Sequence, residues 1–248
     1  MLINFAVAGF ASIDQLQELT FSAFKGQKII STKYEQNYIL SSVNRPTKSS
    51  VIFGNNAVGK TNILYALLGL QQIISTGMPI KNERVFNRLS DTIFFEIIVE
   101  SDEGNSFEYK IKVNKNEQII YEELIKNQDI IFKFSDNRLY SLSLDEKIQD
   151  IYSRESTSTL LSKLKDFITD IYNEFVTTVN NISVVTDMFL NSDVKWFNIT
   201  FSNKHRELIQ NNKELAIQIL RQVDPTIKDI EFEERISDDS DTINYDVK

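Results

Sequence analysis

The sequence predicts an α/β fold, and three patterns carry that prediction. A short apolar run at residues 50–53 leads into a glycine-containing loop, and helical periodicity over residues 62–75 follows the loop. From residue 91 onward, apolar and polar residues alternate with the period of β-strands. Beyond residue 156 the period changes to that of helices. With 248 residues of ordinary globular composition, the chain suits one large domain or one domain with an insertion.

The first 50 residues are expected to form strands. Residues 2–7 are an apolar run, residues 19–24 alternate weakly, and residues 28–40 favour one or two further strands. Residues 50–53 are expected to form a buried strand that feeds the loop. The helix after the loop is predicted to end at Thr76-Gly77-Met78-Pro79, because glycine and proline terminate helices.

A β-meander is predicted to follow that helix. Its strands are expected at residues 92–100, 107–113, 118–125, 130–134 and 138–142. The sequence Asp102-Glu103-Gly104-Asn105 separates the first two strands and is typical of a hairpin turn.

Two helices are predicted in the last part of the chain. The first, residues 156–180, carries an apolar stripe made of Leu160, Leu161, Leu164, Phe167, Ile168, Ile171, Phe175 and Val179. The second, residues 204–223, ends at Asp224-Pro225. The stripe is expected to pack on the second helix, with a partner-binding or dimerising arm as the alternative. Trp196 is interpreted as a buried anchor, or alternatively as a contact point, and residues 227–232 return to strand character.

Composition excludes several classes of function. The net charge of −8 does not favour a polyanion binder. The absence of cysteine excludes disulfides and thiolate metal sites, and the single histidine, His205, lies in a polar stretch typical of an exposed helix start. No apolar run approaches the roughly 20 residues that span a bilayer, and the N-terminus lacks a signal sequence. We expect a soluble, cytoplasmic protein with no membrane partner.

One motif carries chemistry. The run Gly54-Asn55-Asn56-Ala57-Val58-Gly59-Lys60-Thr61 fits the P-loop pattern G-x-x-x-x-G-K-[ST] at every fixed position. The glycines let the backbone approach phosphate closely, and successive N–H groups form an anion-binding nest at the start of a helix. Lys60 is predicted to reach the β- and γ-phosphates as the catalytic lysine, and the Thr61 hydroxyl to bind Mg²⁺. The motif therefore predicts binding of a nucleoside triphosphate with Mg²⁺, and ATP is the expected nucleotide.

The motif alone does not choose between an ATPase, a GTPase and a small-molecule kinase. Asn114-Lys115-Asn116-Glu117 approaches the base-reading signal of GTPases, but it has Glu in place of Asp and falls in an expected hairpin turn. We interpret it as a coincidence. The strands after the P-loop helix argue against a kinase, whose lids are usually helical and rich in arginine.

The start of the chain and the P-loop together resemble a known family. Residues 5–13, with the sequence Phe-Ala-Val-Ala-Gly-Phe-Ala-Ser-Ile, precede strands and a Gly-x-Asn-x-x-Gly-Lys-Thr-Asn loop. This arrangement resembles the ABC-type ATPases of the SMC, RecF and OLD group, in particular prokaryotic ATP-binding proteins of abortive-infection, retron and restriction-linked defence systems. Asn56 and Asn62 are the positions most typical of that family, so the nucleotide site is expected to extend from Gly54 to Asn62.

The resemblance implies an ABC-ATPase head. Residues 1–145 would form a P-loop ATPase lobe with the meander, residues 146–224 an inserted α-helical arm, and residues 225–248 the start of a second ATPase lobe whose remainder is absent. In that group two heads form a dimer that sandwiches two ATP molecules. Sandwiching and hydrolysis gate a partner, either an effector protein such as a toxin or nuclease, or a nucleic acid. The resemblance therefore implies a nucleotide-dependent switch in antiviral defence, and a non-catalytic ATP-binding assembly module is the alternative.

The chain departs from the family pattern in two ways. Family members usually carry a basic residue that contacts nucleotide at the position of Ala11. The signature loop, the Asp-Glu pair and the switch histidine of the second lobe are not found, and Gln71, Gln72 and Gln118 are unpersuasive as the Q-loop glutamine. We therefore expect a fragment, part of a longer protein, or half of a split ATPase. These 248 residues alone are expected to bind nucleotide weakly and to hydrolyse almost none, because hydrolysis needs those missing groups.

Overall fold

The computed structural model describes residues 1–22, 33–39, 42, 44–55, 59–80, 85–135, 138–140, 158–184, 210–223, 232–236 and 243–247. They fall into two compact units, Met1–Asn191 and Ser192–Lys248. Within this part of the chain, no helix is long and apolar enough to cross a membrane.

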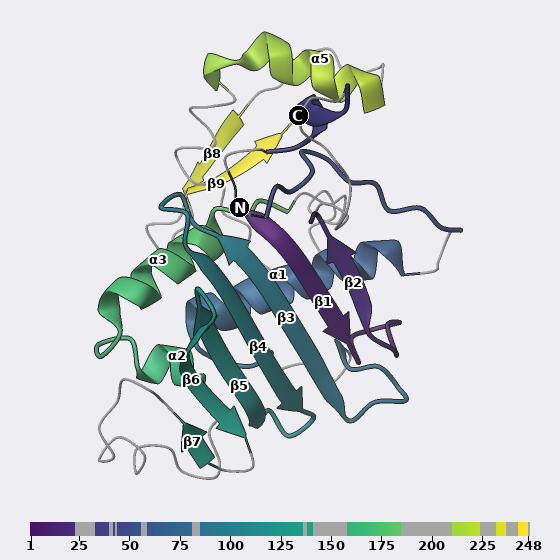
Figure 1. Ribbon diagram of the computed structural model, residues 1–248. Coiled ribbons are helices and arrows are strands. Elements are labelled where there is room, and N and C mark those ends of the chain that lie inside the picture. The colour runs from purple at the N-terminus through teal and green to yellow at the C-terminus, as the bar shows by residue number, and fades with distance from the viewer. Residues whose placement is uncertain are drawn as a thin grey trace. The chain divides into compact units, whose positions relative to one another are not determined.

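A seven-stranded antiparallel sheet forms the centre of the first unit (Figure 1). In spatial order its strands are β2 (Gln17–Thr20), β1 (Leu2–Ala8), β3 (Thr92–Glu100), β4 (Ser106–Asn114), β5 (Ile119–Lys126), β6 (Asp129–Ser135) and β7 (Arg138–Tyr140). The predicted meander is confirmed, and β3 occupies the predicted residues. The first strand pairs with the third, with Phe5 opposite Ile97, so the meander extends outward from the N-terminus.

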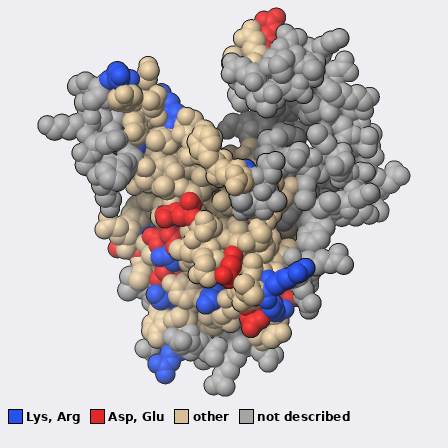
Figure 2. All heavy atoms as spheres, turned by 90° about the vertical axis from the view of Figure 1, so that its right-hand side faces the viewer, with Lys and Arg blue, Asp and Glu red and all other residues tan. Residues whose placement is uncertain are grey.

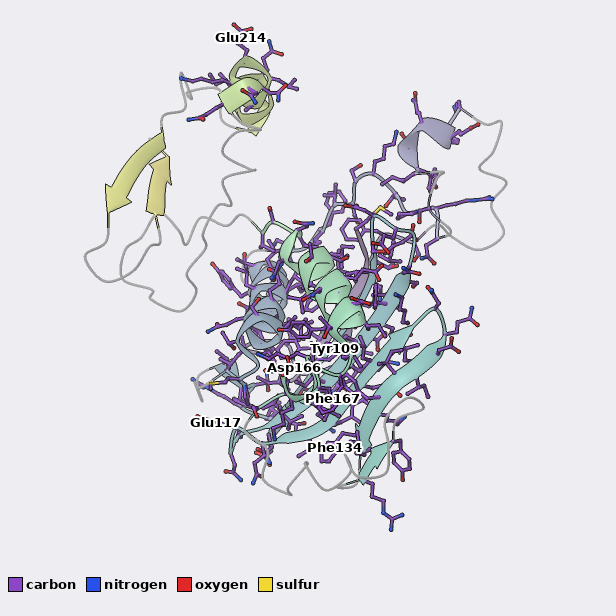
Figure 3. All side chains as sticks on the ribbon, turned by 90° about the vertical axis from the view of Figure 1, so that its left-hand side faces the viewer. Tyr109, Glu117, Phe134, Asp166, Phe167 and Glu214 are labelled. Atoms are coloured by element: carbon purple, nitrogen blue, oxygen red, sulfur yellow. The ribbon has the colours of Figure 1, made fainter. Side chains whose placement is uncertain are left out.

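Three helices cover one face of this sheet (Figure 1). They are α1 (Lys60–Thr76), α2 (Leu160–Lys163) and α3 (Thr169–Asn180). Alternate residues of the strands point toward them, as β3 shows with Ile93, Phe95, Ile97 and Val99, all 1% exposed or less. Tyr109 lies in the layer between the sheet and the helices (Figure 3), with its ring centroid 5.5 Å from that of Phe175 on α3. Burial of these large side chains supplies the main favourable free energy of folding.

The opposite face of the sheet is polar where the strands pair at its middle. Lys110 on β4 lies opposite Glu96 on β3 and Glu123 on β5, and Glu123 lies opposite Lys133 on β6. The Lys133 Nζ–Glu123 Oε1 distance is 3.0 Å. Charges of alternating sign across neighbouring strands stabilise each other, which explains how this face accommodates charged side chains.

The apolar stripe of residues 156–180 does not form one long helix. After α2 the chain makes a turn, and Ile168 has φ −122° and ψ 37°, outside the helical range, before α3 begins. The break turns Phe167 outward, 56% exposed (Figure 3), while Phe175 and Val179 remain buried against the sheet layer. Within its own unit, most of the stripe is buried against the sheet and α1. Its packing on the helix predicted at 204–223 stays a prediction, because that helix belongs to the second unit. The described residues do not show an inserted helical arm.

The expectation of a buried strand at residues 50–53 is also wrong. These residues have no strand pairing, and Val51 and Phe53 are 69% and 89% exposed. A buried strand needs backbone partners, and the seven strands of the described sheet pair only with one another, not with residues 50–53. In the region of the expected strand at 28–40, the described residues contain instead a short 3₁₀ helix, Glu35–Asn37.

The second unit contains a helix and a hairpin. The helix α5 spans Lys213–Val223, which confirms the later part of the helix predicted at 204–223. The strands β8 (Phe232–Ile236) and β9 (Ile243–Val247) pair antiparallel. Of the strand expected at 227–232, only Phe232 falls among the described residues, and His205 and Trp196 lie outside them.

Candidate functional site

The P-loop leads into α1 at the side of the sheet where β2 lies (Figure 1). Of the nine predicted binding residues, Gly54, Asn55 and Gly59 to Asn62 are described, whereas Asn56, Ala57 and Val58 lie outside the described residues. Gly59 is the residue immediately before the helix and has φ 93° and ψ 13°. Glycine adopts this left-handed conformation without steric cost, which explains the second glycine of the motif.

Lys60 extends back over its own loop. Its Nζ donates hydrogen bonds to the carbonyl oxygens of Gly54 at 2.7 Å and Asn55 at 2.6 Å. The ammonium group therefore ties the beginning of the loop to the first turn of the helix. The same group has a third N–H, so it can hold the loop and still contact an anion in the loop.

The N-terminal end of α1 carries no side-chain cap and no acidic group. Gly59 provides no side-chain cap, and the first turn contains no acidic residue. The first N–H groups of a helix have no partner within it, and a helix of 17 residues adds the positive end of its dipole. These features fit the phosphate groups of a nucleotide.

Thr61 is the predicted metal ligand, and it lies exposed in this first turn. Among the described residues, no group of three or more His, Cys, Asp or Glu side chains could hold a metal ion. A threonine hydroxyl at this position fits Mg²⁺ that is shared with nucleotide phosphates, because Mg²⁺ prefers oxygen ligands and usually keeps substrate phosphates and water in its shell.

The turn between β1 and β2 contacts the P-loop through Ser12. Asn62 Nδ2 donates a 2.7 Å hydrogen bond to Ser12 Oγ. The same oxygen lies 2.5 Å from where a Cβ would stand on Gly59, so a larger residue there would displace the Ser12 hydroxyl. Sequence reasoning assigned no role to Ser12, because its contact spans 50 residues of chain.

Backbone hydrogen bonds hold this turn in place. Ala11 has φ 50°, its N–H donates to Val85 O at 2.6 Å, and its carbonyl accepts from Asn87 Nδ2 at 2.8 Å. The Asn87 N–H in turn donates to Gly9 O at 2.8 Å. Residue 11 therefore lies one position before Ser12, the residue that contacts the P-loop.

The other residues considered from the sequence serve the fold. Gln71 donates from Nε2 to the carbonyl oxygens of Val179 at 2.9 Å and Ile182 at 2.7 Å, so it binds the end of α3. Asn114 Oδ1 accepts from the backbone N–H groups of Asn116 and Gln118 in the β4–β5 turn. These contacts agree with the interpretation that the GTPase-like sequence there is a turn.

Acidic and basic side chains are interspersed on the described surface at the β2 side of the molecule (Figure 2). A broad patch of one sign is not seen among the residues drawn in colour there. Within the described part of the chain, Lys60 and the helix N-terminus supply positive charge where a phosphate would bind.

Comparison with known proteins places this geometry in a family. The model of the family described as "AAA domain, putative AbiEii toxin, Type IV TA system" matches residues 49–248, which include the whole P-loop. No curated protein matches the chain.

Proposed function

Because this chain belongs to the AbiEii-type family of AAA domains, which bind nucleotide, we propose that it is a nucleotide-dependent switch in phage defence. In this proposal the P-loop from Gly54 to Asn62 binds ATP with Mg²⁺, and the nucleotide state controls a toxin or nuclease partner. The family's toxin–antitoxin description supports that biological setting. The resemblance to the SMC, RecF and OLD group supports a switch that works through pairs of heads.

The observation that carries the proposal is the position of Lys60. Its ammonium group bridges two carbonyl oxygens of its own loop, at 2.7 and 2.6 Å, beside an uncapped helix N-terminus. A lysine held at that point neutralises the negative charge of phosphate groups seated in the loop. The Thr61 hydroxyl would hold Mg²⁺. Bound Mg²⁺ would neutralise charge on the β- and γ-phosphates.

Hydrolysis and gating are proposed to need more than this loop. Phosphoryl transfer to water requires a group that orients the water and a group that stabilises the γ-phosphate charge. Lys60 provides one such charge, and we propose that a second head in an ATP-bound dimer provides others. An assembly module that binds ATP without using it is the competing function.

A pair of charge-removing variants tests nucleotide binding. Lys60→Ala removes the bridging ammonium, whereas Lys165→Ala removes an exposed lysine on the turn between α2 and α3. With a non-hydrolysable ATP analogue and Mg²⁺, we expect Lys60→Ala to lose at least about tenfold in affinity, because charged hydrogen bonds to phosphate contribute about 1.5–3 kcal/mol. Lys165→Ala should bind as the wild-type chain does. Equal affinities for all three proteins would refute the proposal.

Control of a partner is tested in cells that carry the natural defence locus. Under the switch proposal, Lys60→Ala changes protection against phage, because the effector no longer responds to nucleotide. Under the assembly-module alternative, the complex forms and protection persists when ATP binding is lost. Unchanged protection with Lys60→Ala, once loss of ATP binding has been measured, would reject the switch.

A further inference from the structure

We propose that Ser12 is a positioning residue of the nucleotide site, acting with Asn62 as a polar strut between the β1–β2 turn and the first turn of α1. The inference rests on the proposed function and adds a residue from outside the P-loop to it. In this view the β1–β2 turn fixes the position of the first turn of α1, and therefore of Lys60, relative to the bound phosphates.

The first argument is the contact itself. Asn62 lies two residues after Lys60, and its Nδ2 donates to Ser12 Oγ at 2.7 Å. Ser12 Oγ also lies against the left-handed Gly59, at 2.5 Å from the position of an ideal Cβ. One hydroxyl oxygen therefore lies beside both residues that flank Lys60 and Thr61.

The second argument is the rigidity of the turn that carries Ser12. Its neighbour Ala11 is fixed by backbone N–H and carbonyl hydrogen bonds, at 2.6 Å to Val85 O and 2.8 Å from Asn87 Nδ2. The following residue, Ile13, is buried and donates its N–H to Phe10 O at 2.7 Å. The position of Ser12 is thus restricted, because its neighbours in the turn are hydrogen-bonded to residues 85–87 and within the turn itself.

The third argument concerns the environment of the bond. The Ser12–Asn62 hydrogen bond is exposed to solvent, and exposed hydrogen bonds between side chains contribute little to folding because water competes for both partners. A nucleotide seated over the start of α1 would exclude that water, and the bond would then be stronger. We therefore expect the pair to influence nucleotide affinity much more than the stability of the free protein.

The test is a double-mutant cycle on the full chain. Affinity for an ATP analogue with Mg²⁺ and the midpoint of thermal unfolding without nucleotide are measured for Ser12→Ala, Asn62→Ala and the double variant. The matched control is Gln15→Ala, which removes an exposed side-chain hydrogen bond to Asp14 in the same turn. Lys60→Ala is measured in parallel and tests the proposed function separately.

We expect each single variant to weaken binding roughly 3- to 10-fold. The double variant should bind no more weakly than the single variant with the lower affinity, because all three variants remove the same hydrogen bond. Unfolding midpoints should match that of Gln15→Ala. Three results would overturn the inference: additive losses of affinity in the double variant, affinities equal to that of Gln15→Ala, or a fall in the unfolding midpoint that parallels the loss of affinity. The proposed function would stand in each case if Lys60→Ala still binds nucleotide less tightly than the wild-type chain. A chain whose affinity does not depend on Lys60 would overturn the proposed function and this inference together.

Discussion

The backbone N–H of Leu160 on α2 donates a 2.6 Å hydrogen bond to Oε2 of Glu122, a fully buried carboxylate on β5. The other oxygen, Oε1, accepts at 2.9 Å from the Leu161 N–H and at 2.9 Å from the Tyr109 hydroxyl. A side chain of the sheet therefore satisfies the first N–H groups of a helix that follows it by nearly 40 residues. Burial raises the pKa of Glu122 to about 7, and the three hydrogen bonds and Lys163 oppose that rise without cancelling it.

Glu122 should make stability depend on pH near neutrality. Its pKa rises from 4.5 to about 7 on folding, so the folded chain binds a proton more tightly than the unfolded chain. The contribution of protonated Glu122 to the free energy of unfolding is fully present below pH 4.5 and is lost as the pH rises through about 7. Between pH 5 and 8, the free energy of unfolding of the wild-type chain relative to Glu122→Gln should fall by roughly 2–3 kcal/mol. Urea unfolding of both proteins measures this.

Glu103→Gln is the control for that experiment, because Glu103 is an exposed glutamate on the β3–β4 hairpin. Its difference from the wild-type chain should not change between pH 5 and 8. If the difference between the wild-type chain and Glu122→Gln is equally flat, Glu122 does not titrate in this range and the burial argument is wrong.

Gln71 should stabilise the end of α3. Both of its amide N–H groups are used, toward Val179 O and Ile182 O, so Gln71→Leu leaves two carbonyl groups without these donors. We expect a loss of about 1–3 kcal/mol in the free energy of unfolding. Gln72→Leu, at the exposed neighbouring position, should change stability by no more than about 0.5 kcal/mol. Equal effects of the two variants would show that the Gln71 contacts contribute nothing.

Gly77 and Gly104 allow the conformational cost of replacing a glycine to be measured separately from the cost of a steric clash. Both have positive φ, 70° and 82°, but a Cβ on Gly77 would lie 2.6 Å from Ser162 Cβ, whereas nothing lies within 4 Å at Gly104. Gly104→Ala should therefore lose only the conformational preference, about 1–2 kcal/mol. Gly77→Ala should lose about 2–4 kcal/mol, because it adds a steric clash between the end of α1 and α2. Chemical denaturation measures both, and a smaller loss for Gly77→Ala contradicts the argument.

Glu174 should attach α3 to the meander. Its carboxylate accepts from Lys126 Nζ at 2.7 Å, Ser101 Oγ at 2.6 Å and Asn105 Nδ2 at 2.8 Å. Burial opposes ionisation, but these three donors lower the pKa of Glu174 below its usual value. Glu174→Gln should destabilise the chain by about 1–3 kcal/mol at pH 7, because hydrogen bonds to an ionised group are lost. As the pH falls, Glu174 becomes protonated in the wild-type chain, so the difference should shrink; a constant difference would indicate a loss of packing alone.

Local patterns in the sequence determined much of this protein. Alternation at residues 92–100 predicted β3 at its observed bounds, and the glycine before Met78 predicted the end of α1. The P-loop motif was readable because every residue that it requires lies within eight consecutive positions, where backbone geometry alone brings them together. Periodicity and short motifs succeed when the interactions that they encode are between near neighbours in the chain.

Other features depend on contacts between residues that lie far apart in the chain. Ser12 meets Asn62, and Glu122 meets Leu160, across 50 and 38 residues of chain. The sequence at 156–180 has one continuous stripe, yet the chain breaks at Ile168, where α3 begins against the sheet. Contacts of this kind depend on which strands pair and which face the helices cover. That is a balance of packing and hydrogen bonding over the whole unit, and no local period records it.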